Sequence, residues 1–244
     1  LHYPLRRQRQ MCIRDRIELV LGAEISCLTS DGISVHMLGL LFDGENAAMQ
    51  QILADSRDTR IPRMRKMVEL LKADGIDISL EDVQAQTPAG ATVGRPHLAD
   101  ALVHKGVVAS RDEAFLNLLH NESKYYVTHA APTPVEAVRA IHAAGGVAVI
   151  AHPFASRRGQ IITSETFADL VAVGLNGIEV DHRDQNVEER KTLREIAQEL
   201  NLVITGSSDY HGTGKLNAMA ENTTLAAQWE ALEAQADARR VVRV

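Results

Sequence analysis

Residues 145–154 of the chain read Gly-Gly-Val-Ala-Val-Ile-Ala-His-Pro-Phe. The continuous apolar run after the glycine pair predicts a short strand buried on both faces, as parallel strands between helices are. The run ends at His152, and Pro153 cannot continue a central strand because it has no backbone N–H to donate. This stretch therefore predicts an imidazole at the carboxyl end of a buried strand, where open α/β sheets and (β/α) barrels carry their chemistry.

A second stretch of the chain has the same organisation. Residues 202–206 predict another buried strand, and Asp209 and His211 follow at its carboxyl end. With His152, these residues offer a carboxylate and imidazoles at two strand ends, a good ligand set for a divalent metal. The alternative interpretation is a helix-capping aspartate beside incidental histidines, which explains each residue alone better than it explains the group.

Two further polar residues lie in apolar segments nearer the start of the chain. Residues 17–43 predict two strands joined by a turn at Ser30-Asp31-Gly32; the first contains Glu24 and the second His36. Burying either side chain is costly without a partner, and a metal ion would supply one. Taken alone, Glu24 is better explained as an edge-strand charge in solvent, and His36 as a hydrogen-bonded core histidine.

From residue 132 onward, helical and strand patterns alternate regularly. The strand that follows residues 147–151 ends at His182, so we expect His182 at the same rim as His152. Strand–helix–strand spacing of this kind predicts parallel pairing through right-handed crossovers. The expected helices are 133–141, 163–172 and 187–200, and the expected strands are 147–151, 175–182 and 202–205.

The remaining central region is helical in pattern. Residues 45–74 predict helices with a break at Arg60-Ile61-Pro62, and residues 75–131 predict an inserted helical unit. Within this unit, Pro96 suits the first turn of a helix, which places Arg95 and His97 at an amino terminus that favours anions. Helix capping and surface polarity explain Arg95 and His97 equally well at this level.

Composition limits the classes of function. The 244 residues, of which 45% are hydrophobic, predict one large domain or a domain with an insertion. The net charge of -6 argues against a broad electropositive surface for duplex DNA, although a local anion pocket is compatible with it. Cys12 and Cys27 form neither a disulfide framework nor a paired-cysteine zinc motif, so a reducing, cytoplasmic location is expected. No apolar run approaches the ~20 residues of a membrane-spanning helix.

The first sixteen residues differ from the rest of the chain, with five arginines and one acidic residue. They lack the apolar core of a signal peptide, and residues 11–16 resemble translated adapter sequence. We therefore expect residues 1–16 to be a non-native segment and the native amino-terminal part to be missing. The alternative is a basic arm that contacts nucleic acid.

Four motifs together resemble those of the PHP (polymerase and histidinol phosphatase) family. They are Gly22-Ala23-Glu24-Ile25, Val35-His36-Met37-Leu38-Gly39, Ala151-His152-Pro153 and the turn from Gly206 to His211. The stretch from Gly94 to His97 resembles an insertion in the branch of nucleoside-3′,5′-bisphosphate phosphatases and 5′-to-3′ exoribonucleases of short RNA. The resemblance covers about residues 17–227 and implies an α/β fold, a distorted (β/α)7 TIM-like barrel formed by residues 17–74 and 132–244, with residues 75–131 as an inserted helical cap.

The resemblance also implies roles for individual residues. Arg95 and His97 would hold the substrate phosphate, and His182 would hold substrate or pass a proton to the leaving oxygen. The family carries up to three divalent ions, and oxygen and imidazole ligands without thiolate suit manganese, iron or zinc. The metal ligands implied are Glu24, His36, His152, Asp209 and His211.

This chain departs from the family pattern before its Gly-x-Glu segment. A His-x-His strand and an Asp-His motif are expected there, and neither is present. We therefore expect an incomplete metal cluster and poor catalysis by this chain. Three hypotheses stand: a phosphoesterase acting on nucleotides or short RNA, a histidinol-phosphate phosphatase, and a truncated non-catalytic module. The insertion with Arg95 and His97 argues against the second, and the oligomeric state stays open.

Overall fold

The structure is a computed structural model, and it describes residues 19–88, 91, 93–127, 131–156, 161–210, 217–238 and 241–242. The chain forms two compact units. The first, here called the α/β unit, comprises the residues up to 53 and those from 131 onward, and the second, the helical unit, comprises residues 54–130. Among the described helices, none is long and apolar enough to cross a membrane.

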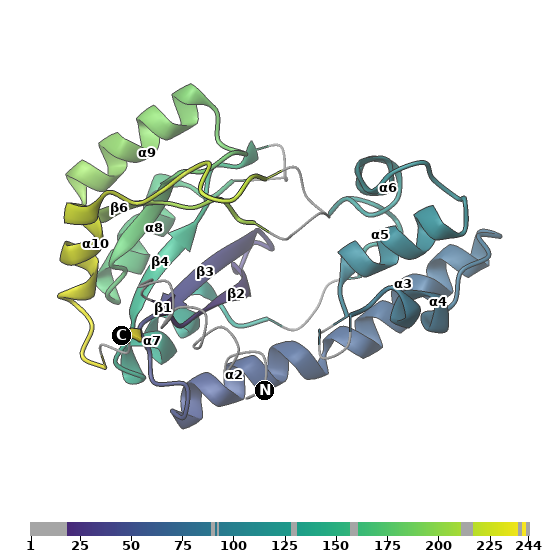
Figure 1. Cartoon of the computed structure of the whole chain (residues 1–244), viewed down its shortest axis with the longest axis horizontal. Coiled ribbons are helices and arrows are strands. Elements are labelled where there is room, and N and C mark those ends of the chain that lie inside the picture. Colours follow the sequence, from purple (N-terminus) through teal and green to yellow (C-terminus); the bar gives the residue numbers. More distant parts are fainter. Residues whose placement is uncertain are drawn as a thin grey trace. The chain divides into compact units, whose positions relative to one another are not determined.

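The α/β unit is built on an open sheet of five strands in the order β2-β3-β4-β5-β6 (Figure 1). Strands β2, β3 and β4 pair antiparallel, whereas β4, β5 and β6 pair parallel, as the alternating pattern after residue 132 predicted. The short strands β1 (Leu19–Val20) and β7 (Val241–Val242) pair with each other separately. The five strands are β2 (Gly22–Leu28), β3 (Ser34–Leu40), β4 (Val147–Ala151), β5 (Gly177–Asp181) and β6 (Val203–Gly206).

Helices precede, separate and follow the three parallel strands along the chain. In α7 (Pro134–Ala143) and α9 (Val187–Glu199), a polar residue before the helix and a glutamate three positions later form reciprocal capping boxes, which satisfy amide groups that have no intrahelical partner. The helix α8 (Ser164–Ala172) lies between β4 and β5 in sequence, and α10 (Ala226–Glu233) follows β6. The helix α2 (Ala47–Asp58) begins in the α/β unit and ends in the helical unit.

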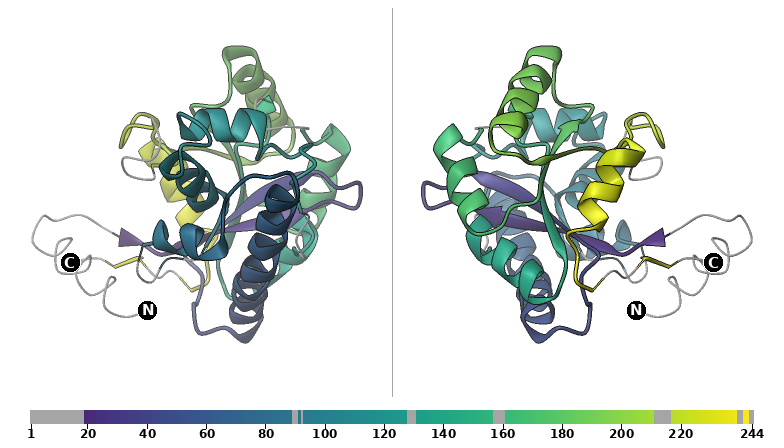
Figure 2. Two further views of the ribbon diagram at one scale, coloured as in Figure 1. Left: turned by 90° about the vertical axis from the view of Figure 1, so that its right-hand side faces the viewer. Right: turned by 90° about the vertical axis from the view of Figure 1, so that its left-hand side faces the viewer.

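Helices lie on both faces of the sheet (Figure 1, Figure 2). Each face also has an apolar core. The larger core joins the sheet to α7, α8 and α9, and the smaller one joins it to α10. Strand β4 contributes Ala148 and Ile150 to the first and Val147 and Val149 to the second, so it is buried on both faces as its sequence predicted. The larger core includes Ile25, Met37, Ile141, Phe167, Ile178, Val180 and Leu193.

The helical unit has its own core. It contains α3 (Arg60–Ala73), α4 (Leu80–Ala85), α5 (Arg95–His104) and α6 (Arg111–Asn117). The predicted break near Pro62 falls between α2 and α3, and Pro62 then occupies the first turn of α3, where its missing N–H has no intrahelical partner to lose. The buried residues of this core include Met64, Met67, Leu71, Ile78, Leu98, Leu102 and Leu119.

The close approach of backbone at Gly146 gives a test of this fold. A Cβ atom at Gly146 would lie 2.6 Å from Phe42 Cβ and 2.7 Å from the carbonyl oxygen of Leu40. We expect Gly146→Ala to lower the free energy of unfolding by about 1–3 kcal/mol, because neighbouring backbone must shift. Gly44→Ala is the matched control, since a Cβ there meets nothing within 4 Å. Equal urea midpoints for the two variants would contradict the packing described.

Candidate metal centre

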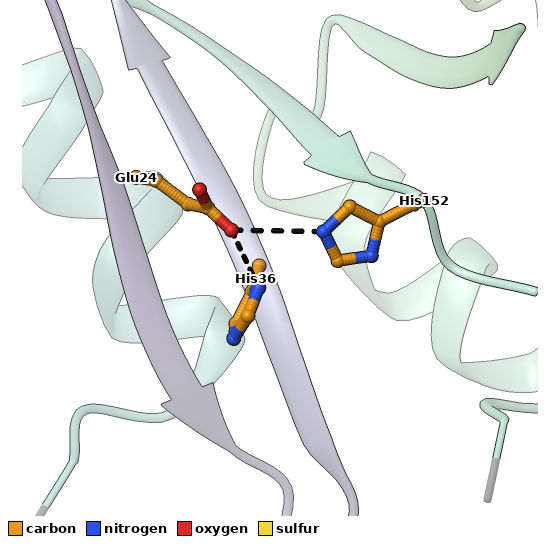
Figure 3. A group of neighbouring side chains, drawn as sticks. All are labelled: Glu24, His36 and His152. Atoms are coloured by element: carbon orange, nitrogen blue, oxygen red, sulfur yellow. Dashed lines mark ion pairs between the residues drawn. The ribbon is translucent and has the colours of Figure 1, made fainter. Parts of the chain in front are cut away.

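The register of the β2–β3 hairpin brings Glu24 and His36 together. Glu24 pairs with Leu38, and Ser26 pairs with His36, so Glu24 and His36 are diagonal neighbours on one face. This face is opposite to the one on which Ile25 and Met37 enter the larger core. As a result, Nδ1 of His36 lies 2.5 Å from Oε1 of Glu24 (Figure 3).

His152 reaches the same carboxylate from the end of β4. His36 pairs with Ala151, so His152 is the next residue along, and its φ of 30° turns the chain sharply after the strand. Nε2 of His152 lies 3.6 Å from Oε1 of Glu24, and the His36 and His152 rings are 5.2 Å apart between centroids. One carboxylate oxygen therefore faces two imidazoles, as Figure 3 shows.

The two imidazoles set the ionisation of Glu24. Burial alone would raise the pKa of Glu24, but the close contacts of its carboxylate with the His152 and His36 imidazoles, together with their charge, hold that pKa well below its usual range. The carboxylate is therefore an anion at neutral pH, which is the form that binds metal ions.

These three side chains fit a divalent metal ion. Their ligand atoms all lie within 4.8 Å of one another. In addition, Nδ1 of His36 is buried and has no hydrogen-bond partner of proper geometry, so its contact with Glu24 does not satisfy it. A carboxylate oxygen with imidazole nitrogens and no thiolate suits manganese, iron or zinc.

Asp209 and His182 lie beside this group at the next strand ends. Asp209 follows β6 with a φ of 48°, and its Oδ2 lies 3.6 Å from Nε2 of His182. The His182 and His152 rings are 4.8 Å apart between centroids. The structure thus brings Asp209 next to His182 and His182 next to His152, while the predicted ligand His211 lies outside the described residues.

Hydrogen bonding fixes the tautomer of His182. Its side chain is fully buried, and its Nδ1 accepts a hydrogen bond of 3.1 Å from the backbone N–H of Asp184. The proton of the neutral ring is therefore on Nε2, which is buried without a hydrogen-bond partner. His182 consequently offers an N–H donor, rather than a lone pair, toward Asp209.

Sequence reasoning missed a buried carboxylate in β5. Glu179 is 2% exposed; its Oε2 accepts from the backbone N–H of His152 at 2.9 Å, and its Oε1 accepts from the Ser207 hydroxyl at 2.5 Å. Burial raises the pKa of Glu179, against the hydrogen bond from Ser207 and the charge of His182. The signal was present in the sequence, because Glu179 interrupts an apolar strand between Ile178 and Val180 just as Glu24 interrupts its own.

Arg95 and His97 lie in the helical unit, at the start of α5. Nη1 of Arg95 donates to the carbonyl oxygen of Leu119 at 3.0 Å and to Oδ1 of Asn121 at 2.7 Å. Nδ1 of His97 accepts the backbone N–H of Gly94 at 3.0 Å, as in a capping box. Burial lowers the pKa of both side chains, so the His97 ring is neutral near pH 7, with its proton on Nε2.

The fold and the donor set define the chain as a metal-dependent hydrolase. It is 32% identical over 196 residues to a 5′-3′ exoribonuclease of Haemophilus influenzae, an alignment that covers 80% of this chain and 70% of that protein. A 3′,5′-nucleoside bisphosphate phosphatase of Chromobacterium violaceum is 29% identical over 202 residues, with 83% and 70% coverage. Among solved structures, one presented as that of a metal-dependent phosphoesterase from Bifidobacterium adolescentis matches 95% of this chain and 82% of its own, with a TM-score of 0.89 and 36% identity.

The chain therefore belongs to the PHP family of phosphoesterases, in the branch of the nucleoside bisphosphate phosphatases and 5′-3′ exoribonucleases. No family model matches the sequence. The (β/α)7-type fold expected from the sequence motifs is confirmed, with an open sheet in the part of the chain that the structure describes.

The cluster of Glu24, His36 and His152 predicts a measurable metal affinity. We expect Glu24→Gln to weaken Mn²⁺ binding by at least ~10-fold, because the variant loses the only formal negative charge among these three ligands. Isothermal titration of the metal-free chain measures the change. Glu45→Gln is the matched control, because Glu45 is exposed and outside the cluster. Equal Mn²⁺ affinity in the two variants would show that Glu24 binds no metal.

Proposed function

We propose that the protein hydrolyses phosphate esters of nucleotides or of short RNA at a centre formed by Glu24, His36 and His152. The observation that carries the proposal is the convergence of these ligand atoms within 4.8 Å. The names of its relatives, which include an exoribonuclease and a nucleoside bisphosphate phosphatase, support the substrate class.

The α/β unit contains the proposed metal ligands. Divalent ions of manganese, iron or zinc would be held by Glu24, His36 and His152, with Asp209 and His211 as further ligands. Bound divalent ions would supply acidified water and neutralise charge on the phosphoryl oxygens, which is most of what phosphate-ester hydrolysis requires. The anionic state of Glu24 keeps this ligand ready to bind at neutral pH.

His182 is the proposed proton donor. Its Nε2 carries the proton of the neutral ring, has no hydrogen-bond partner, and lies 3.6 Å from Oδ2 of the proposed ligand Asp209. An N–H in this position can donate a hydrogen bond to a substrate oxygen, and the imidazolium form of the ring would pass a proton to the leaving group and return to the neutral ring.

Arg95 and His97 are the proposed phosphate-binding residues. Arg95 lies over the Tyr126 ring at 5.3 Å, and Arg63 lies over the same ring at 5.1 Å. Neither guanidinium has a carboxylate partner among the described residues, and Nη2 of Arg63 is buried without a hydrogen-bond partner. Burial lowers the pKa of Arg95, and the charge of Arg63 lowers it further; a phosphate would balance the charge of both guanidinium groups.

This proposal predicts the effect of removing the Arg95 charge. We expect Arg95→Gln to weaken binding of adenosine 3′,5′-bisphosphate by ~10- to 100-fold, because a charge-assisted hydrogen bond to phosphate is lost. The measurement is isothermal titration of the metal-loaded chain, with phosphate release as a second readout.

The matched control for this experiment is Arg111→Gln. Arg111 lies in the same unit, but its guanidinium is already bonded to Asp100, which raises the pKa of Arg111. It therefore does not need a phosphate to balance its charge. Its removal should leave affinity for the bisphosphate within about threefold of the original. If Arg95→Gln and Arg111→Gln bind the nucleotide equally, Arg95 does not hold the phosphate.

A further inference from the structure

Two buried polar side chains, Glu179 and Gln185, support the chain segment that follows β4; together they are here called the polar bracket. Glu179 accepts the backbone N–H of His152 through Oε2, at 2.9 Å. Two residues along, the backbone N–H of Phe154 donates to Oε1 of Gln185 at 3.0 Å. Both bracket side chains are almost completely buried, Glu179 at 2% and Gln185 at 1% exposure. The segment that carries a proposed metal ligand is therefore held by side chains rather than by sheet hydrogen bonds.

The bracket is itself anchored to β5. Glu179 is a residue of that strand, and Nε2 of Gln185 donates to the carbonyl oxygens of Glu179 at 3.1 Å and of Val180 at 2.7 Å. Because strand β5 lies between β4 and β6, its position is fixed on both sides by the sheet ladder. A hydrogen-bond acceptor attached to this strand therefore holds the His152 segment in a fixed position relative to β5.

The same carboxylate also reaches the loop after β6. Oε1 of Glu179 accepts the hydroxyl of Ser207, and the backbone N–H of Ser207 donates to the carbonyl oxygen of Asp181 at 3.1 Å. Ser207 is two residues before Asp209, so Glu179 links both of the loops that carry proposed ligands from β4 and β6. Glu179 does not belong to the ligand group formed by Glu24, His36 and His152 among the described residues.

His152 needs such support because its backbone conformation is unfavourable. Its φ of 30° lies on the left-handed side, which is unfavourable for a residue with a Cβ and persists only where surrounding structure imposes it. Without the bond to Glu179, the segment could relax toward an ordinary φ, and the imidazole would move away from Glu24.

We propose that Glu179 is a positioning residue of the metal centre, which holds His152 at Glu24 and His36 by accepting its backbone N–H, and which ties the Ser207 loop to the same strand. The inference rests on the proposed metal centre. Glu179 acts through His152 and contacts neither metal nor substrate. Ligand residues held by outer hydrogen bonds commonly lose ~10- to 100-fold in metal affinity when that support is removed.

The test compares Mn²⁺ affinity of the whole chain and its variants by isothermal titration. Glu179→Leu keeps the volume but removes the acceptor, and we expect it to bind Mn²⁺ at least ~10-fold more weakly. Glu179→Gln retains an oxygen for the His152 N–H and a donor for Ser207, so we expect affinity within about threefold of the original. Equal affinities for Glu179→Leu and the unmodified chain would overturn the proposal.

A double-mutant cycle separates positioning from a general loss of stability. If Glu179 acts through His152, then Glu179→Leu should have no further effect on Mn²⁺ affinity once His152→Ala has been made. Additive losses would overturn the proposal. Thr205→Val is the matched control: Thr205 is buried in β6 opposite Glu179, and its hydroxyl donates to the carbonyl of Ile178, so metal affinity should not change.

Two further outcomes are informative. If Glu179→Leu does not fold, Glu179→Ala replaces it, because the space left can admit a water in place of the lost carboxylate, and the same loss of affinity is expected. An unmodified chain that binds no Mn²⁺ would overturn the metal centre and the positioning role together, whereas normal binding with an unaffected Glu179→Leu would overturn the positioning role alone.

Discussion

The register that joins β2, β3 and β4 decides whether this protein has a metal centre at all. Glu24 and His36 converge because their strands pair diagonally at these positions, and His152 joins them because Ala151 is the partner of His36. Side chains alternate between the faces of a strand, so a slip of one residue in β2 would send Glu24 into the apolar core and bring Ile25 to the site. The burial of Ile25 and Met37 on the opposite face therefore stabilises the same register that the site requires.

Almost all polar groups at the centre of such a sheet must form hydrogen bonds. An unpaired polar group in an apolar interior costs about 1–3 kcal/mol, and a charge costs more. Glu179 and Gln185 meet this requirement by bonding to backbone and hydroxyl groups around them. The described exceptions in the α/β unit are Nδ1 of His36 and Nε2 of His182, and both face the proposed metal ligands. Buried polar atoms without a partner are concentrated where a bound ion or substrate would supply the missing interaction.

The sequence was most informative where short-range pattern determines structure. The strand ending at His152, the capped helices and the parallel order after residue 132 all follow from local periodicity and turn residues, and the structure confirms them. Glu24 and His36 were ambiguous because each, taken alone, fits an ordinary surface or core residue, and only the pairing of distant strands distinguishes the two cases. Glu179 interrupts an apolar strand, which indicates a buried carboxylate, but its partners are a backbone N–H and a hydroxyl that follow other strands, so its role could not be predicted from its own position.

Charge is distributed differently in the two units. In the α/β unit, the carboxylates of Glu24 and Asp209 lie close to three histidines, a set that suits cations. In the helical unit, Arg63 and Arg95 share one aromatic ring with no carboxylate partner among the described residues, a set that binds anions. A cation and an anion suit these two sets separately. The net charge of -6 therefore does not reveal that the two units carry local groups of opposite charge. For this reason, overall composition argued against duplex DNA but was compatible with a nucleotide.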